Sequence, residues 1–129
     1  YHQAFPEVKR LLYQCSDVAN SRGYVKSALG RRSRFLGQPG RRERTHKALN
    51  AVIQSSGADV TKLNLVASYR ERKALGLTLR LSVHDSQEAD LSDPSKVPQY
   101  EDLLNTQKAA FRVPLLWEVK SGASWASAK

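Results

Sequence analysis

Residues 77–91 read LTLRLSVHDSQEADL, and this stretch joins a strand pattern to a turn that carries titratable side chains. Apolar and polar residues alternate from Leu77 to Val83, and alternation with period two is typical of a strand with one buried face. Short polar residues at 84–86 end the alternation, and residues 87–91 can run back as a second strand. The stretch therefore predicts a tight hairpin whose turn presents His84 and Asp85.

Two interpretations of this turn stay open at this point. A carboxylate at the end of a rigid strand is well placed to bind a metal ion or to steer a proton. An Asp in a turn, however, commonly hydrogen-bonds its own backbone, which would make Asp85 a purely structural residue. The rest of the chain has to decide between them.

Length and composition exclude several classes of protein. The chain has 129 residues, 40% of them hydrophobic, which suits one folded domain with its own core. No apolar run approaches the roughly 18 residues that span a bilayer, and no signal-peptide pattern opens the sequence. We therefore expect an intracellular protein with no membrane partner. The lone Cys15 excludes an internal disulfide, and no Cys/His spacing typical of zinc sites occurs.

The first residue is Tyr1 and the sequence contains no Met, so we expect a single domain, residues 1–129, cut from a longer chain.

Positive charge is concentrated in one segment of a chain whose net charge is +9. Between residues 22 and 47, Lys and Arg are accompanied by one acidic residue, Glu43. Such a segment suits a phosphate backbone or an anionic membrane, and Arg binds phosphate oxygens with a bidentate fork. We expect nucleic-acid binding, with a merely solvated basic surface as the alternative. The Arg and His residues of interest are Arg31, Arg32, Arg41, Arg42, Arg44 and His46.

The remaining periodicities predict the other elements. In order, they are a helix over 6–21, a hairpin over 23–36, a long helix over 41–75 with a break signal at 55–57, the hairpin over 77–91, a helix over 98–111 and a strand over 114–120. This order argues for an α+β fold, with a small antiparallel sheet made of β-hairpins and backed by helices. We expect Trp125 to pack back onto it. The expected buried stripe of the long helix is Leu49, Val52, Ile53, Val60 and Leu63.

Asn50 and Gln54 stand four residues apart in the long helical pattern, on a face other than the apolar stripe. The minor groove of DNA presents purine N3 and pyrimidine O2 acceptors at every base pair. Amide donors aimed at those atoms can bind DNA of any sequence. The alternative is a pair of surface amides with no such role.

Five segments together resemble the C-terminal end of family A (Pol I-like) DNA polymerases. They are YHQAFPEV at 1–8, RGYVKSALGRR at 22–32, LNAVIQSSGAD at 49–59, VHD at 83–85, and the closing stretch from VPLL at 113–116 to GASW at 122–125. They cover nearly the whole chain in the family's order, and the combination is specific although each segment alone is weak.

The resemblance implies a role for each matching residue. Asp85 matches the motif C aspartate that binds catalytic magnesium in the palm, and His84 matches the histidine beside the primer terminus. Asn50 and Gln54 match residues near the minor groove of the primer–template. Arg31 and Arg32 match an Arg pair of the family. The implied cofactors are two Mg²⁺ ions, and the implied partners are primer–template DNA, deoxynucleoside triphosphates and the remainder of the polymerase chain.

The sequence also departs from the family pattern. Ser86 stands where the family has Glu, and a hydroxyl is a weaker metal ligand than a carboxylate. Our hypothesis is that Glu88, on the same strand face, partly compensates as a metal ligand. His46 replaces an Arg beside the DNA, and Val52 replaces a Pro, which relaxes a break in the long helix. Asp59 is expected to be structural.

Three classes of function remain. The leading one is the palm and fingers portion of a template-directed DNA polymerase that adds deoxynucleotides by two-metal phosphoryl transfer, inactive as a fragment. The second is a non-catalytic nucleic-acid-binding module on the same scaffold, which Ser86 and the missing motif A aspartate favour. The third is a basic interaction protein with incidental motif likeness.

Overall fold

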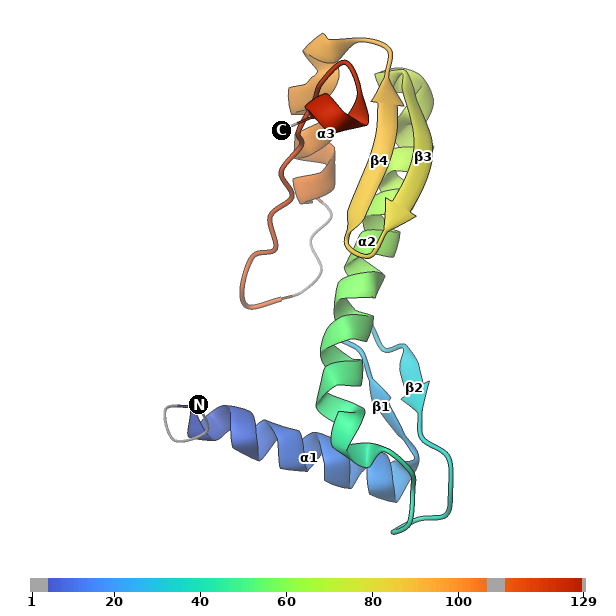
Figure 1. The fold of residues 1–129 in the computed structure, drawn as a ribbon, viewed down its shortest axis with the longest axis vertical. Coiled ribbons are helices and arrows are strands. Elements are labelled where there is room, and N and C mark those ends of the chain that lie inside the picture. The colour runs from blue at the N-terminus through green and yellow to red at the C-terminus, as the bar shows by residue number, and fades with distance from the viewer. Residues whose placement is uncertain (1–4, 107–110, 129) are drawn as a thin grey trace. The chain divides into compact units, whose positions relative to one another are not determined.

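A computed structural model describes residues 5–106 and 111–128. The chain divides into two compact units, Tyr1–Asp59 and Val60–Lys129, and helix α2 (Ala48–Leu75) contributes its first turns to one and its last turns to the other. Helices and antiparallel hairpins alternate along the chain, so the predicted α+β class is confirmed (Figure 1). Part of the first motif, residues 1–4, lies outside the described residues.

The first unit contains helix α1 (Pro6–Arg22) and a hairpin of strands β1 (Tyr24–Lys26) and β2 (Arg32–Arg34). Pro6 occupies the first turn of α1, and Gly23 ends the helix with a left-handed φ of 76°, donating its N–H to Ala19 O at 2.9 Å. The core of the unit is small: Ala19, Val25 and Ala48 are buried. The predicted helix and hairpin are both confirmed.

The long helix differs from the prediction at its start. A 3₁₀ turn (Thr45–Lys47) precedes α2, which begins at Ala48 rather than near residue 41. Arg44 has a left-handed φ of 59°, which is incompatible with a continuous α-helix through that position. The break signal at 55–57 is wrong as well. Ser55 and Ser56 donate their hydroxyls to Val52 O, a local bond that leaves the helix intact.

The buried stripe of α2 is the predicted one only in part. Val60 is buried and Leu49 and Val52 are half-buried, but Ile53 is 60% exposed and Leu63 is exposed too. The side of α2 that is buried in the second unit carries small and polar residues instead, namely Thr61, Asn64, Ala67 and Ser68. Small side chains allow neighbouring elements to approach closely, whereas the larger Leu63 faces solvent.

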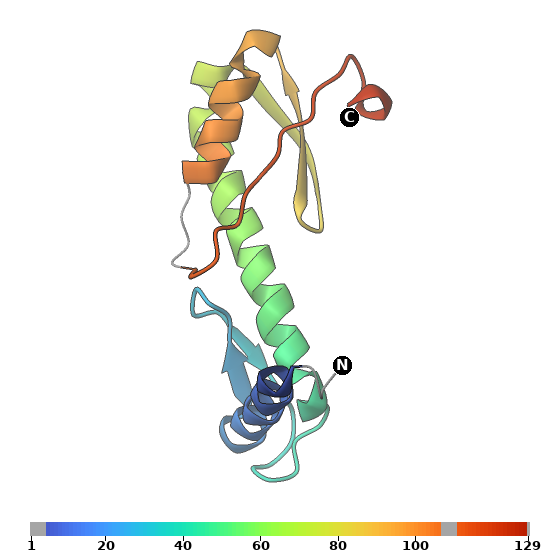
Figure 2. The ribbon, with the colours of Figure 1, turned by 90° about the vertical axis from the view of Figure 1, so that its left-hand side faces the viewer.

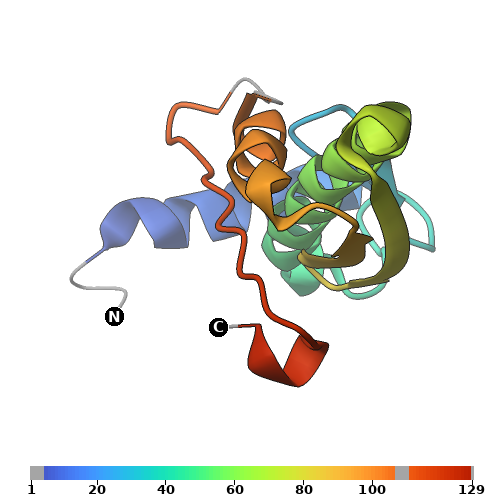
Figure 3. The same ribbon diagram turned by 90° about the horizontal axis from the view of Figure 1, so that it is seen from above.

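The second unit contains strands β3 (Leu77–Val83) and β4 (Ser86–Leu91), a 3₁₀ turn (Pro94–Lys96) and helix α3 (Val97–Thr106). The two strands pair antiparallel, as predicted. The end of α2 and helix α3 lie side by side on one face of this hairpin (Figure 3). Leu75, Leu77, Tyr100 and Leu104 form the buried core between these elements.

An irregularity in β3 changes which side chains face the core. Leu77 pairs with Leu91 and Leu79 with Ala89, but Leu81 pairs with Glu88, so Arg80 is an extra residue in the ladder. A β-bulge of this kind places two residues opposite one and shifts the alternation. Beyond it, Leu81 and Val83 are 56% and 41% exposed. The prediction that all four apolar residues of β3 share a buried face is therefore wrong for its second half.

The C-terminal stretch does not form the predicted strand. Residues 114–120, all within the described part of the chain, run extended past α3 without strand pairing (Figure 2). Their backbone bonds go to side chains of α3: Asn105 donates to Trp117 O at 2.8 Å and accepts from Trp117 N at 2.7 Å. Helix side chains thus replace a neighbouring strand. Trp125 is 78% exposed, so the expectation that it packs back is wrong. Helix α3 is described as far as Thr106. Of the rest of the predicted helix, residues 107–110 lie outside the described residues and Phe111 is not helical.

The buried phenol of Tyr100 predicts a pH dependence of stability. Burial raises its pKa, and its hydrogen bond with Ser68 opposes that shift in part. Above the ordinary tyrosine pKa of about 10, the unfolded chain releases this proton more readily than the folded one, so the unfolding free energy falls as pH rises toward the raised value. In urea titrations up to about pH 11, Tyr100→Phe should show a smaller fall than the unmodified protein. The exposed control Tyr13→Phe should show the same fall in unfolding free energy as the unmodified protein. If the unfolding free energy of Tyr100→Phe fell with pH as steeply as that of the unmodified protein, Tyr100 would not be the source of the pH dependence.

Candidate functional site

The β3–β4 turn consists of His84 and Asp85, since Val83 and Ser86 already form a ladder pair. His84 adopts a left-handed φ of 53°, a conformation that is uncommon for residues other than glycine and costs backbone energy. A tight two-residue loop requires such a conformation to reverse the chain. The turn predicted from the sequence is confirmed, and it holds Asp85 at the end of two hydrogen-bonded strands.

The carboxylate of Asp85 is exposed, and it makes no hydrogen bond or ion pair with any described residue. The structural interpretation, in which it bonds its own backbone, is therefore not what the described residues show. By contrast, Asp93 caps the next 3₁₀ turn by accepting from Ser95 N and Ser95 Oγ, and these bonds lower the pKa of Asp93. Asp85 is thus available to a ligand in a way that Asp93 is not.

Ser86 and Glu88 lie on the outer face of the hairpin, next to the turn. Ser86 Oγ donates to Val83 O at 3.0 Å and lies 3.5 Å from Glu88 Oε1. Glu88 is half-buried and sits opposite Leu81. The shared face that the sequence suggested for Ser86 and Glu88 is present, and a carboxylate lies within reach of the hydroxyl.

The described residues do not form a closed metal site. Within residues 5–106 and 111–128, no group of three or more His, Cys, Asp or Glu could hold a metal ion. Mg²⁺ commonly uses only one or two protein carboxylates and completes its octahedron with water and substrate phosphates. The exposed carboxylate of Asp85 has the donor chemistry that such an open site uses.

Asn50 and Gln54 are exposed on α2 within the first unit. Neither amide has a hydrogen-bond partner among the described residues, so their donors are free to contact a ligand. The two residues lie one helical turn apart, which places both amides on the same side of the helix. The predicted amide face is therefore present as a surface feature.

The predicted basic residues fall into two groups. Arg31 donates to Ser55 O and forms an ion pair with Asp59, with Nε–Oδ1 at 2.7 Å. Arg42 donates to Asn20 O at 3.0 Å and to Gly37 O. Both guanidinium groups thus already bond the protein itself. The other predicted residues have exposed side chains: Arg32, Arg41, Arg44 and His46.

Asp59 is structural, as predicted. Its carboxylate is buried, accepts from Ser27 Oγ at 2.5 Å and pairs with Arg31. Ser27 Oγ in turn accepts from Arg31 N at 3.0 Å. These bonds hold the β1–β2 turn on α2.

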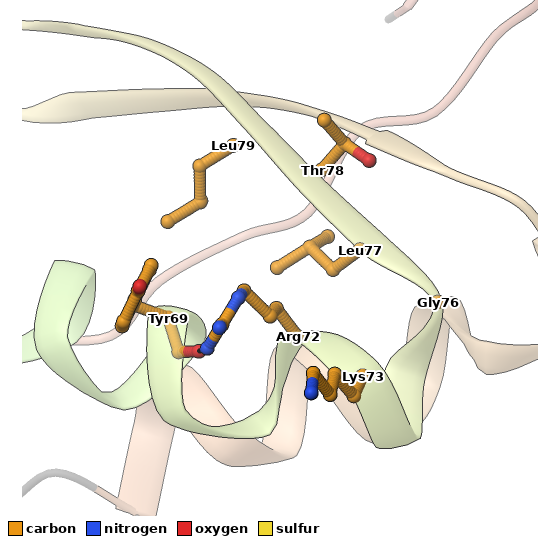
Figure 4. Close-up of a pocket in the computed structure, with 7 residues that line it drawn as sticks. All are labelled: Tyr69, Arg72, Lys73, Gly76, Leu77, Thr78 and Leu79. Atoms are coloured by element: carbon orange, nitrogen blue, oxygen red, sulfur yellow. Dashed lines mark hydrogen bonds between the residues drawn. The ribbon is translucent and has the colours of Figure 1, made fainter.

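One surface hollow was not predicted from the sequence. It lies where α2 ends and β3 begins, around Gly76, and Figure 4 shows Leu77 and Leu79 reaching from β3 toward Tyr69 and Arg72. The Arg72 guanidinium carbon lies 3.7 Å from the centroid of the Tyr69 ring. None of the predicted site residues lines this hollow, and no sequence pattern marks it, because the stacked pair sits on an ordinary charged helix face.

Comparisons with known proteins bear on the family and the fold of the chain. A solved structure described as the POL domain of Pol1 from M. smegmatis in complex with DNA primer-template and dNTP matches with a TM-score of 0.66 and 30% identity, covering 82% of this chain and 20% of that one. Most of this chain therefore shares the fold of about a fifth of that polymerase chain.

Sequence relatives give the same result. The DNA-directed DNA polymerase of Pseudomonas phage M6 is 32% identical over 93% of this chain and 18% of its own length. DNA polymerase I of Deinococcus radiodurans is 30% identical over 100% of this chain and 14% of its own length. The model of DNA polymerase family A matches residues 1–127. The chain belongs to DNA polymerase family A, and it spans less than a fifth of the length of these two relatives.

A search of the described residues for membrane spans found no helix with the length and apolarity to cross a bilayer.

The Asp59 contacts predict a specific loss of stability. Asp59→Ala removes the acceptor of the Ser27 hydroxyl and the ion-pair partner of Arg31, which keeps only its bond to Ser55 O, so the unfolding free energy should fall by about 1–3 kcal/mol. Asp17→Ala, at an exposed position of α1, should change it by less than about 0.5 kcal/mol. Chemical denaturation measures both. Equal effects would show that Asp59 does not hold the β1–β2 turn.

Proposed function

We propose that these 129 residues are the C-terminal palm and fingers portion of a template-directed DNA polymerase, which adds deoxynucleotides to a primer 3′ end. Family membership supports this proposal, as does the solved relative, which is a complex with DNA primer-template and dNTP. The observation that carries it is the Asp85 carboxylate, exposed and unpartnered among the described residues at the end of a rigid hairpin.

Nucleotidyl transfer builds negative charge on the attacking and leaving oxygens, and two Mg²⁺ ions in the complete site would neutralise that charge. In this chain Asp85 would hold a metal ion, and Glu88 would act as a further ligand where the family has Glu at position 86. A hard cation prefers such carboxylate oxygens. The other acidic ligands would come from the remainder of the polymerase chain.

We propose that exposed amide side chains and exposed basic side chains both contact the DNA. The free amides of Asn50 and Gln54 donate to minor-groove acceptors, which every base pair presents. Arg32, Arg41, Arg44 and His46 contact backbone phosphates. Arg31 and Arg42 act differently in this proposal, because their internal bonds shape the surface that the others use. His84 lies beside the primer terminus.

A second candidate is a non-catalytic nucleic-acid-binding module on the polymerase scaffold. The observation in its favour is Ser86, since a neutral hydroxyl stands next to Asp85 where the family has a carboxylate. In this candidate the DNA contacts are kept and magnesium-dependent incorporation is lost.

Primer extension by the complete chain that carries these residues separates the two candidates. Asp85→Asn keeps the size of the side chain but removes its charge. The transition state then loses several kcal/mol of stabilisation by the metal ion, so incorporation should slow at least about a hundredfold. Asp102→Asn, an exposed acid on α3, serves as the matched control and should leave the rate unchanged.

Magnesium-dependent incorporation that survives Asp85→Asn at an unchanged rate would contradict the metal-binding role proposed for Asp85. An unmodified chain that binds primer–template but incorporates nothing would favour the binding module.

The salt dependence of DNA binding tests the proposed contacts. Arg41→Ala should weaken binding and reduce the slope of log K against log salt by about one, because one phosphate contact is lost. Replacing Asn50 and Gln54 together by Ala should weaken binding without changing the slope, since neutral amides release no counterions. Fluorescence anisotropy with a labelled primer–template measures both. Affinity that does not respond to salt would favour a protein-interaction module instead.

A further inference from the structure

Gln87 lies two residues beyond Asp85, and its amide is bonded on the inner side of the hairpin. Gln87 Nε2 donates to Thr61 O of α2 at 3.3 Å. Gln87 Oε1 lies 3.3 Å from Ser68 Oγ and 3.5 Å from Tyr100 Oη. One strand side chain therefore contacts both helices that back the hairpin.

Gln87 faces inward because β4 alternates without interruption, on the same side as Ala89 and Leu91, and the bulge at Arg80 places the polar Ser82 rather than Leu81 opposite it. With the shifted register Gln87 pairs with Ser82, while Ser86 and Glu88 on either side of it face outward. Gln87 is thus the inward-facing residue of β4 closest to the turn. Apolar packing does little at this end, because Leu81 and Val83 are exposed; the apolar core surrounds Leu77, at the other end of the hairpin.

The surroundings of Gln87 form a buried polar layer. Asn64 and Ser68 are fully buried on α2, and Thr61 is nearly so. Ser68 Oγ also lies 2.8 Å from Asn64 O and 3.3 Å from Tyr100 Oη. Buried polar groups that lose a partner pay a desolvation cost, and hydrogen bonds, unlike apolar contacts, specify both distance and direction. This layer therefore defines one position of the hairpin end against α2 and α3.

We propose that Gln87 is a positioning residue for the metal site: its amide fixes the hairpin end on α2 and α3, and so sets where the Asp85 carboxylate points. Gln87 touches neither metal nor DNA in this proposal and acts through the strand that it anchors. The inference rests on the proposed function for its catalytic consequence, whereas the anchoring itself does not depend on that function.

The test uses Gln87→Leu in the complete chain, since Leu keeps most of the volume and removes every hydrogen bond. Gln99→Leu, the same chemical change at an exposed position of α3, is the matched control. In Gln87→Leu, amide hydrogen exchange at residues 83–86 should accelerate at least about tenfold, corresponding to about 1.4 kcal/mol of lost local stability. The Mg²⁺ concentration for half-maximal primer extension should rise several-fold, while the KM for nucleotide stays the same. Gln99→Leu should change none of these quantities.

Tyr100→Phe is the second variant; it keeps the ring, removes one hydrogen bond to Gln87 Oε1, and should shift the same two quantities in the same direction by less. Unchanged exchange at residues 83–86 in both variants overturns the proposal. Faster exchange with an unchanged Mg²⁺ requirement overturns the link to the metal site. If the unmodified chain extends no primer, the proposed function fails, and the exchange rates alone still decide whether Gln87 anchors the turn.

Discussion

The extra residue in strand β3 determines what the hairpin presents on each face. Up to Leu79 the strand buries its apolar residues against α2 and α3, and beyond Arg80 the alternation is reversed. Leu81 and Val83 consequently lie on the outer face beside Ser86 and Glu88, while the unbroken alternation of β4 keeps Gln87 on the side of Ala89 and Leu91, facing the helices. Arg80 itself forms an ion pair on the outer face with Asp90, with Arg80 Nη2 at 2.6 Å from the carboxylate, a contact that is exposed and so weak. The chemistry of the outer face depends on this register.

Much of the fold could be predicted from the sequence, because local signals agree with the tertiary structure there. Pro6 and Gly23 mark the ends of α1, and the break in alternation at 84–86 marks the turn. The bulge could not be predicted, since LTLRLSV alternates without interruption and the shift appears only in the pairing with β4. The strand expected at 114–120 does not form, for a related reason. A strand needs a neighbouring strand to pair with, and here Asn105 of α3 supplies the backbone hydrogen bonds instead.

The features of the candidate site could likewise be predicted only in part. The turn position of Asp85 could be predicted because short polar residues end the alternation of the strand, whereas its role as a metal ligand is implied by the resemblance to the family and stays a prediction. The internal bonds of Arg31 and Arg42 could not be found, because a basic segment looks the same whether its side chains face solvent or cap carbonyl groups. The polar layer around Ser68 was missed because Thr61, Asn64 and Ser68 at helical spacing resemble an exposed face. Charge and hydropathy patterns indicate which interactions a side chain can make, whereas the folded structure determines which of them it makes.

The proposed metal site requires that the Asp85 carboxylate binds a divalent ion when DNA is present. Mn²⁺ shares the preference of Mg²⁺ for carboxylate oxygens and broadens the NMR signals of nearby nuclei. Titrated at substoichiometric concentration into the complete chain bound to primer–template, Mn²⁺ should broaden the amide signals of residues 84–86 first, and Asp85→Asn should abolish that selectivity. Identical broadening in both proteins, or broadening centred on another part of the chain, would contradict the account.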